Sequence, residues 1–212
     1  MTHITVTVAI PAEVNPGPEL YEAVSAALDP FDENLEVETY VDLTAQQIAN
    51  DTEFQKFWLK LTEEKPAAVS FAHAVEGWWG GQLGEDGNLW STCNPEGRWD
   101  WWVIGGRWAG QWVLKPGATR ALAPQRSAFG FTEESKDPRR TDAARKAEIE
   151  PTSIAPSYAY IGLDGQWHQQ GHMGWFATAA DQLSAQAWAQ TYTEWMQSLP
   201  ADTWLVKVDA HL

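Results

Sequence analysis

A tryptophan-rich segment, WDWWVIGGRWAGQW at residues 99–112, limits most strongly what this chain can fold into. It holds five of the fourteen tryptophans in 212 residues. Both faces of a strand over residues 99–104 would be mostly apolar, so we expect that strand to lie largely inside a core. Gly105 and Gly106 then break it, because glycine permits a positive φ and a close approach by other groups. The segment therefore predicts a buried strand that ends in a sharp turn.

Alternating hydrophobicity predicts a half-buried strand near each end of the chain, at residues 3–10 and 204–211. In each of them, β-branched or aromatic side chains occupy one face and polar side chains the other. The polar faces hold His3, Thr5 and Thr7 in the first strand and Lys207, Asp209 and His211 in the last. Each strand is therefore expected to bury one face only.

The remaining periodicity predicts helices and strands that interleave along the chain. Helices are expected at residues 18–29, 44–64 (with a Thr44–Gln47 capping box) and 181–198, with a short one at 140–148. Strands are expected at residues 35–41, 67–75 and 107–114, and as a hairpin around Asp164–Gly165 within 157–171.

Interleaved elements with long central connections favour the α+β class over a doubly wound parallel sheet. We expect a mostly antiparallel central sheet with two or three packed helices and a long irregular excursion. The length suits a single domain, residues 1–212. Residues 115–156 contain little apolar sequence and are predicted to be a long loop or mobile excursion within that domain.

Charge is unevenly distributed in a chain whose net charge is −15. Residues 98–146 contain ten of the fourteen cations and five acids, a net charge of +5, so the rest of the chain carries −20. This asymmetry suggests an anionic partner at one place and repulsion of anions elsewhere, although a solvated basic surface loop would give the same pattern. The overall charge makes nucleic acid an improbable partner of the whole protein.

Several classes of protein are disfavoured by composition. The apolar runs are too short for a membrane span, and the N-terminal sequence lacks the pattern of a signal peptide, so we expect a cytoplasmic protein. Cys93 is the only cysteine, which excludes an internal disulfide and a multi-cysteine zinc site. No catalytic or nucleotide-binding signature is present, and Cys93 has no neighbour in sequence that would activate it.

The glycine turn and the basic segment supply the candidate ligand-binding residues. Turn amides beside an arginine can bind a phosphate or carboxylate, and tryptophan faces can stack on a base. A second group falls within one helical turn of the short helix expected at 140–148. The candidate residues are Trp99, Trp101, Gly105, Gly106, Arg107, Trp108, Asp142, Arg145 and Lys146. The alternatives are a bulge in a tryptophan-rich core with Arg107 paired to an acid, and simple surface ion pairing at 142–146.

Scattered histidines are more often surface or hydrogen-bonded residues than metal ligands, so we expect neither a metal nor another cofactor. His168 and His172 lie four residues apart, across a predicted strand end rather than on a helix. A mixed site of His3, Asp209 and His211 would require the first and last strands to be neighbours.

Four segments and the C-terminus resemble a family of uncharacterised proteins from bacteriophages and their bacterial, often actinobacterial, hosts. They are LDPFDENLEVETY (28–40), NPEGRWDWWVIGGRWAG (94–110), DAARKAEIE (142–150), GQWHQQGHMGWF (165–176) and the terminal VDAHL. The chain departs from the family pattern at Trp102, Ala143 and Ala210, where tyrosine, glutamine and cysteine are common. The resemblance implies an accessory protein in the host cytoplasm, acting on host processes or defence, and it implies no particular activity.

Three functions are compatible with these observations. The first is a non-catalytic protein that binds a small anionic, nucleotide-like or phosphate-bearing ligand at the glycine turn and the basic segment, for example in counter-defence. The second is an acidic interaction module or DNA mimic that binds a host protein. The third is an enzyme acting on a nucleotide, with Asp100, Asp142, His168 or His172 as acid–base groups. We rank the enzyme last, because no nucleophile or base with a partner can be named.

Overall fold

The computed structural model describes residues 2–64, 69–121, 137–173, 179–180 and 183–211. The chain forms two compact units, one of Met1–Asp32 with Arg98–Leu212 and one of Glu33–Gly97. We call them the sheet unit and the inserted unit. This differs from the single domain expected from length, because the inserted unit builds a hydrophobic core of its own.

A mostly antiparallel sheet organises the sheet unit. Its strands run in the order β10 (Trp167–Gln169), β9 (Ala159–Ile161), β1 (His3–Ile10), β13 (Trp204–His211) and β5 (Trp101–Ile104), and β8 (Ala143–Arg145) also pairs with β13. Only the β1–β9 pair among these is parallel. The predicted α+β class is confirmed.

The strands β1 and β13, which are the first and last along the chain, are direct neighbours in the sheet. In the β1–β13 register, His3 lies opposite His211, Thr5 opposite Asp209, and Thr7 opposite Lys207. Both polar faces predicted from the sequence therefore lie on the same side of the sheet, because successive side chains alternate between the two faces of a strand. We call this side, with these six residues, the polar face.

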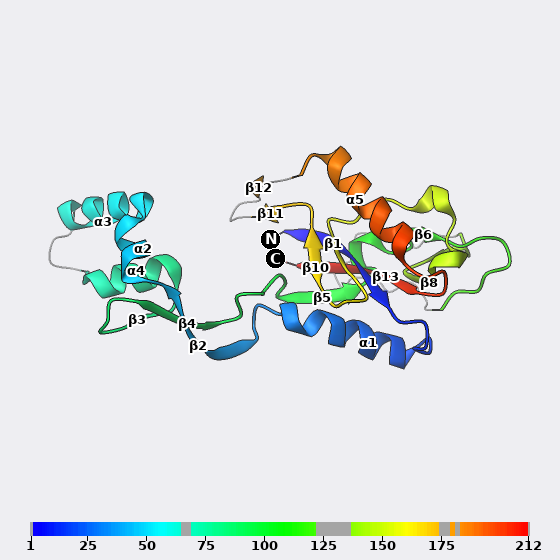
Figure 1. Cartoon of the computed structure of the whole chain (residues 1–212), viewed down its shortest axis with the longest axis horizontal. Coiled ribbons are helices and arrows are strands. Elements are labelled where there is room, and N and C mark those ends of the chain that lie inside the picture. Colours follow the sequence, from blue (N-terminus) through cyan, green and yellow to red (C-terminus); the bar gives the residue numbers. More distant parts are fainter. Residues whose placement is uncertain (1, 65–68, 122–136, 174–178, 181–182, 212) are drawn as a thin grey trace. The chain divides into compact units, whose positions relative to one another are not determined.

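The sheet lies between two helices, α1 (Pro18–Leu28) and α5 (Ala185–Ser198) (Figure 1). Both begin and end near the predicted positions, and Ser184 caps α5 by accepting from the backbone N–H of Ala187. Their buried side chains are Leu20, Val24 and Leu28 in α1 and Trp188, Tyr192 and Met196 in α5. Each such side chain contributes about 1.5–3 kcal/mol when fully buried. Together the two helices cover both faces of the sheet.

Short elements connect the sheet to its periphery. They are the 3-10 helices η1 (Asp29–Phe31), η2 (Gly106–Trp108), η3 (Lys146–Glu148) and η4 (Pro151–Ser153), and the two-residue strand pairs β6 (Trp112–Val113) with β7 (Arg140–Thr141) and β11 (His172–Met173) with β12 (Ala179–Ala180). The prediction of a helix at 140–148 is therefore wrong. Residues 140–141 pair with β6 and residues 143–145 with β13, two partners far away in sequence. Residues 122–136 of the predicted excursion lie outside the described residues.

The inserted unit packs three helices against a small sheet. Its strands are ordered β2 (Glu36–Leu43), β4 (Leu89–Cys93), β3 (Gln82–Leu83), and its helices are α2 (Ala45–Asn50), α3 (Thr52–Glu64) and α4 (Phe71–Trp79). The buried core consists of Ile48, Phe54, Ala74, Val75 and Leu89. No helix within the described parts of either unit is long and apolar enough to cross a membrane.

Two predictions for the inserted unit need correction. The helix expected over 44–64 is divided at Asp51, whose carboxylate accepts from the backbone N–H of Phe54 at 2.7 Å and starts a second helix. The strand expected at 67–75 is wrong in its described part, because Ser70 caps a helix there instead. A short apolar run such as this one does not distinguish a strand from a buried helix by period alone.

Candidate functional site

The Gly105–Gly106 turn brings the backbone of the 105–110 segment against two buried carboxylates. Both glycines have a positive φ, 75° and 53°. A Cβ on Gly105 would collide with the carboxylate of Asp142, and one on Gly106 with the carboxylate of Asp209. Both aspartates are fully buried. Glycine is required at both positions by backbone conformation and by space.

Amides of this segment donate hydrogen bonds to the chain's own carboxylates. The N–H of Arg107 donates to Asp209 Oδ2 at 2.9 Å, and the N–H of Gly110 donates to Asp142 Oδ1. The carboxylates that contact these amides thus belong to the protein itself, whereas the prediction was of an external ligand. An external phosphate at these two amides would have to displace a buried, hydrogen-bonded carboxylate, which is costly.

Arg145 and Lys146 are engaged with backbone carbonyls and do not join Arg107. The guanidinium of Arg145 donates to the carbonyls of Ala12 at 2.7 Å and Asp202 at 2.6 Å, and it lies 3.8 Å above the ring of Trp204. The ammonium of Lys146 donates to carbonyls at the C-terminal end of α5. The expected convergence of these cations with Arg107, whose own side chain is exposed, is therefore absent from the described residues.

The tryptophans of the 99–112 segment serve different purposes. Trp99 is buried and donates from its indole nitrogen to the carbonyl of Leu28 at 3.1 Å, so it belongs to the core. Trp112 is fully buried, and Trp108 is half-buried in η2. Trp101 stacks on His211 with 5.4 Å between the ring centroids. Within the described residues, the core interpretation thus holds for most of this segment.

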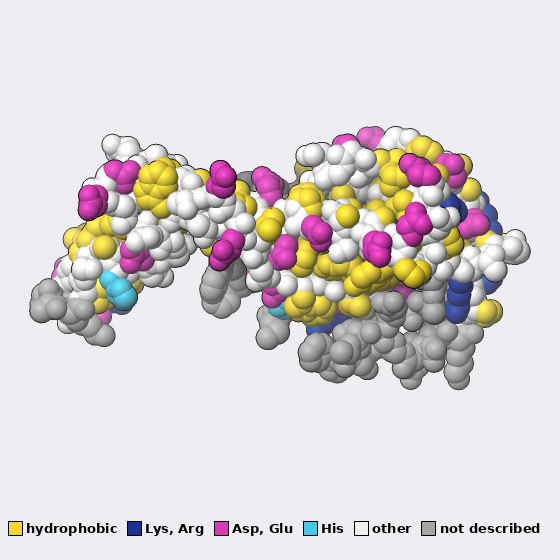
Figure 2. Space-filling model, turned by 90° about the horizontal axis from the view of Figure 1, so that it is seen from below, with side chains coloured by type: hydrophobic (Ala, Val, Ile, Leu, Met, Phe, Trp, Pro, Cys, Tyr) yellow, Lys and Arg dark blue, Asp and Glu magenta, His cyan; other side chains and the backbone are white. Residues whose placement is uncertain are grey.

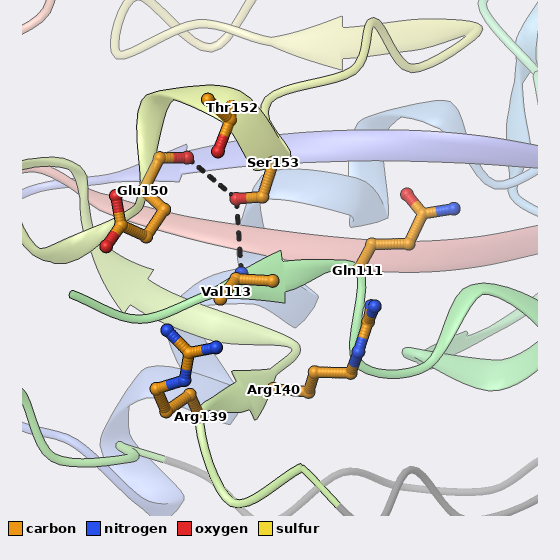
Figure 3. A pocket seen from close by; sticks show the side chains of 7 residues that line it. All are labelled: Gln111, Val113, Arg139, Arg140, Glu150, Thr152 and Ser153. Atoms are coloured by element: carbon orange, nitrogen blue, oxygen red, sulfur yellow. Dashed lines mark hydrogen bonds between the residues drawn. The ribbon is translucent and has the colours of Figure 1, made fainter. Parts of the chain in front are cut away.

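A pocket of about 540 Å³ lies beside the turn segment and contains the cations best placed to bind a ligand. Its lining residues are Gln111, Val113, Arg139, Arg140, Glu150, Thr152 and Ser153. In the close-up, the guanidinium groups of Arg139 and Arg140 lie on one side of Val113, and Glu150, Thr152 and Ser153 lie on the other (Figure 3). We call this the two-arginine pocket.

Local hydrogen bonds position the walls of the two-arginine pocket. Arg140 donates from Nη1 to the carbonyl of Gly110 at 3.0 Å, which connects the pocket to the glycine-rich segment. Ser153 Oγ accepts from the N–H of Val113 at 3.2 Å and donates to the carbonyl of Glu150 at 2.8 Å. The Ser153 hydroxyl thereby holds η4 against β6. The guanidinium of Arg139 is also engaged, because its Nη2 lies 3.4 Å from Asp137 Oδ2.

The electrostatics of the two-arginine pocket favour an anion weakly rather than strongly. The lining carries two cations and one carboxylate, in a chain whose net charge is −15. Asp137 lies next to Arg139, and the backbone N–H of Arg139 lowers the pKa of its carboxyl. On the face shown in Figure 2, acidic side chains are scattered widely, whereas Lys and Arg gather mainly at one end of the sheet unit.

A second pocket, of about 380 Å³, surrounds Arg145. Its other lining residues are Ala12, Ala147, Glu148, Ala201 and Asp202. Two carboxylates oppose a guanidinium that is already bound to carbonyls, so this pocket is poorly suited to an anion.

The polar face of the sheet contains the remaining chemistry-bearing side chains. His3 Nδ1 lies 2.8 Å from Asp209 Oδ1, and His211 Nδ1 lies 2.6 Å from Asp100 Oδ1. His168, by contrast, is exposed and stacks on Tyr160. The side chain of His172 lies outside the description. No group of three or more potential metal ligands of the His, Cys, Asp or Glu type occurs among the described residues.

Lys207 is buried in the middle of the polar face, and its ammonium contacts hydroxyl and carbonyl oxygens rather than a carboxylate among the described residues. Its ammonium donates to Ser157 Oγ at 2.5 Å and lies 4.4 Å from the ring centroid of Trp112. Burial lowers the pKa of Lys207 to about 7 and raises the pKa of the neighbouring Tyr192 to about 12. Burial therefore disfavours the charged form of each group.

Sequence reasoning missed most of the two-arginine pocket. Glu150, Thr152 and Ser153 have no distinctive spacing and lie in the segment expected to be an excursion, and Gln111 lies in a segment expected to be a strand. The signal that could have found the pocket is the Arg139–Arg140 pair within the basic segment.

Comparison with family models, with curated proteins and with solved structures finds no match to this chain. The resemblance of its segments to phage and actinobacterial proteins therefore stays a prediction.

Proposed function

We propose that this protein binds a small phosphate-bearing anion of nucleotide type in the two-arginine pocket. The observation that carries the proposal is the placement of Arg139 and Arg140 on one wall of a pocket of about 540 Å³, beside hydroxyl and amide side chains. Small-molecule sites have volumes of roughly 300–1,000 Å³, so the space suits a nucleotide.

Arginine is well suited to this role, because its planar fork donates two parallel hydrogen bonds to phosphate oxygens. Two neighbouring guanidinium groups match the spread of charge on a diphosphate. Thr152 and Gln111 add neutral donors on the same lining. The Glu150 carboxylate repels a phosphate group but can accept a hydrogen bond from a sugar hydroxyl. This combination favours a nucleotide over inorganic phosphate.

The described lining of the pocket shows no activated nucleophile, which supports binding without turnover. It contains no histidine, cysteine or lysine, and the Ser153 hydroxyl is bonded to the backbone of Val113 and Glu150 rather than to a base. A protein that holds a nucleotide without converting it would sequester it. Together with the family resemblance, this makes sequestration of a host nucleotide signal the role that we propose.

Calorimetric titration of the full-length chain with ADP and with pyrophosphate tests the proposal. We expect one ADP per chain, and an increase in Kd of roughly tenfold or more in Arg139→Gln, because a charged hydrogen bond contributes about 1.5–3 kcal/mol. Arg107→Gln is the matched control: it removes the same charge from an exposed side chain outside the pocket lining and should leave Kd unchanged.

Two results would overturn this assignment. One is the absence of binding by either ligand. The other is an equal loss of affinity in Arg107→Gln and Arg139→Gln, which would indicate general charge attraction or a ligand at the glycine turn.

A further inference from the structure

We propose that His3 and His211 together bind a divalent transition-metal ion of the kind that prefers imidazole nitrogen, such as Zn²⁺ or Co²⁺. The two histidines come from opposite ends of the chain and lie directly opposite each other in the β1–β13 pair. Opposed residues of an antiparallel pair project from the same face of a sheet. This inference is independent of the two-arginine pocket.

Each imidazole is held at one nitrogen by a carboxylate. Asp209 binds Nδ1 of His3 at 2.8 Å, and Asp100 binds Nδ1 of His211 at 2.6 Å. An ionised carboxylate only accepts hydrogen bonds, so Nδ1 carries the proton in each neutral ring and Nε2 keeps its lone pair. Metal-binding histidines are typically held in this way, with the second nitrogen donating to a carboxylate.

The separation of the rings fits a shared ion. Their centroids are 5.2 Å apart and the ring planes meet at 74°. With a metal–nitrogen bond of about 2.0–2.1 Å, each centroid would lie about 3.2 Å from the metal, and two such centroids at a tetrahedral angle would be about 5.2 Å apart. The observed centroid separation is thus the one expected for two imidazoles that share one ion through Nε2.

Nε2 of His211 lacks a hydrogen-bond partner among the described residues. The side chain of His211 is only 8% exposed, and its buried Nε2 has no partner within the described structure. An unsatisfied buried polar atom costs about 1–3 kcal/mol unless something binds it. A metal ion on the Nε2 lone pair would remove that cost.

Neighbouring groups favour a cation at this position. Asp209 and Asp100 place two carboxylates behind the imidazoles, and Trp101 packs against both rings, parallel to His211 and edge-on to His3. The backbone N–H of Arg107 fixes the other oxygen of Asp209. With two protein ligands, the other two positions of a tetrahedral ion would be taken by water or by a bound ligand.

Zinc titration of metal-stripped, full-length protein tests the proposal. We expect one Zn²⁺ per chain, with affinity at least tenfold lower in His3→Gln and in His211→Gln. His168→Gln is the matched control, because this exposed histidine lies apart from the pair and its loss should not change affinity. Asp100→Ala, which releases Nδ1 of His211, should weaken binding about tenfold as a positioning change.

A measurement on the unmodified protein tests the same proposal without requiring that the variants fold. Zn²⁺ should shift the ¹⁵N resonances of Nε2 in both His3 and His211, while the Nδ1 resonances change less. Binding that persists in His211→Gln, or Nε2 resonances that do not move at saturating Zn²⁺, would overturn the proposal.

Discussion

At the scale of single residues, two glycines of the sheet unit pack closely against two aspartates. Gly105 and Gly106 leave room for the buried carboxylates of Asp142 and Asp209. Backbone amides of the same segment donate to those carboxylates, and Asp209 in turn holds His3. The glycine turn therefore supports the histidine pair as well as the strand end.

Replacing Gly106 by alanine should strongly destabilise the sheet unit. We expect a loss of about 3 kcal/mol or more, since the positive φ costs about 1–2 kcal/mol and displacing the buried Asp209 carboxylate adds about 1–3 kcal/mol. Gly165→Ala is the matched control, because Gly165 has a similar φ of 73° with open space around it. It should cost only about 1 kcal/mol. Urea unfolding of the two variants measures the difference, and equal losses would contradict the close-packing argument.

Lys207 should make folding stability rise with pH above neutrality. Burial lowers its folded pKa to about 7, while the unfolded chain keeps the proton up to the ordinary value of 10.5. The unfolded state thus binds more protons between these values, and stability should increase by about 1.4 kcal/mol per pH unit at most. The measurement is urea unfolding at pH 7, 8 and 9.

Comparison with Lys207→Met isolates this effect. The variant should be more stable than the parent at pH 7 and should show a flatter pH profile up to pH 9. Tyr192 does not interfere there: its raised pKa, about 12, gives stability that is present below pH 10 and lost only above it. If the free energy of unfolding changed with pH in the same way in the parent and the variant, the pKa of Lys207 would not be lowered by burial.

At the scale of elements, η3 connects the sheet to the end of α5. Lys146 donates to the carbonyls of Gln197 and Leu199, where helix carbonyls lack intrahelical partners. Arg145, just before it, binds the carbonyls of Ala12 and Asp202. These two cations, expected from the sequence to bind a ligand, instead join three segments of the chain.

Lys146→Met should therefore lower stability without changing ligand affinity. We expect a loss of about 1–2 kcal/mol from the missing carbonyl contacts and the loss of a cation at a helix C-terminus. Lys146→Arg, which keeps the charge, should recover most of it. Urea unfolding checks stability and ADP calorimetry checks affinity. A large fall in ADP affinity would return Lys146 to the binding site.

The elements that could be predicted are those whose signal is local. The alternation over residues 3–10 and 204–211 identified β1 and β13, and helical spacing identified α1 and α5. The strands at residues 140–145 were missed, because their regularity comes from pairing with β6 and β13 rather than from their own pattern.

The candidate site was predictable only in part, for a similar reason. The sequence indicated that Gly105 and Gly106 permit a positive φ and close approach by another group, and both are found. The identity of the anions, Asp142 and Asp209, depends on chain crossings that no local pattern records. The pairing of His3 with His211 likewise depends on which strands become neighbours.

At the scale of the whole molecule, the inserted unit is one continuous stretch, Glu33–Gly97, between two parts of the sheet unit. Each unit has its own buried core. Proteins can open locally, in contiguous cooperative units that differ in stability. Removing a large side chain from one core should therefore favour opening of the unit that contains it. The two units should therefore respond separately to core substitutions.

Hydrogen exchange of two core variants measures this independence. Phe54→Ala, at a fully buried position of the inserted unit, should cost about 3–5 kcal/mol there and speed exchange within residues 33–97. Val208→Ala, at a fully buried position of β13, should speed exchange in β1 and β13 instead. Faster exchange throughout the chain in either variant would show that the two units unfold as one.

Anion binding at Arg139 and Arg140 is tested most directly by NMR observation of the arginine side chains during an ADP titration of the full-length protein. The account predicts that the Nε–Hε resonances of Arg139 and Arg140 shift with occupancy while that of Arg107 stays in place. Resonances of Arg139 and Arg140 that remain fixed at saturating ADP, or a shift confined to Arg107, would contradict it.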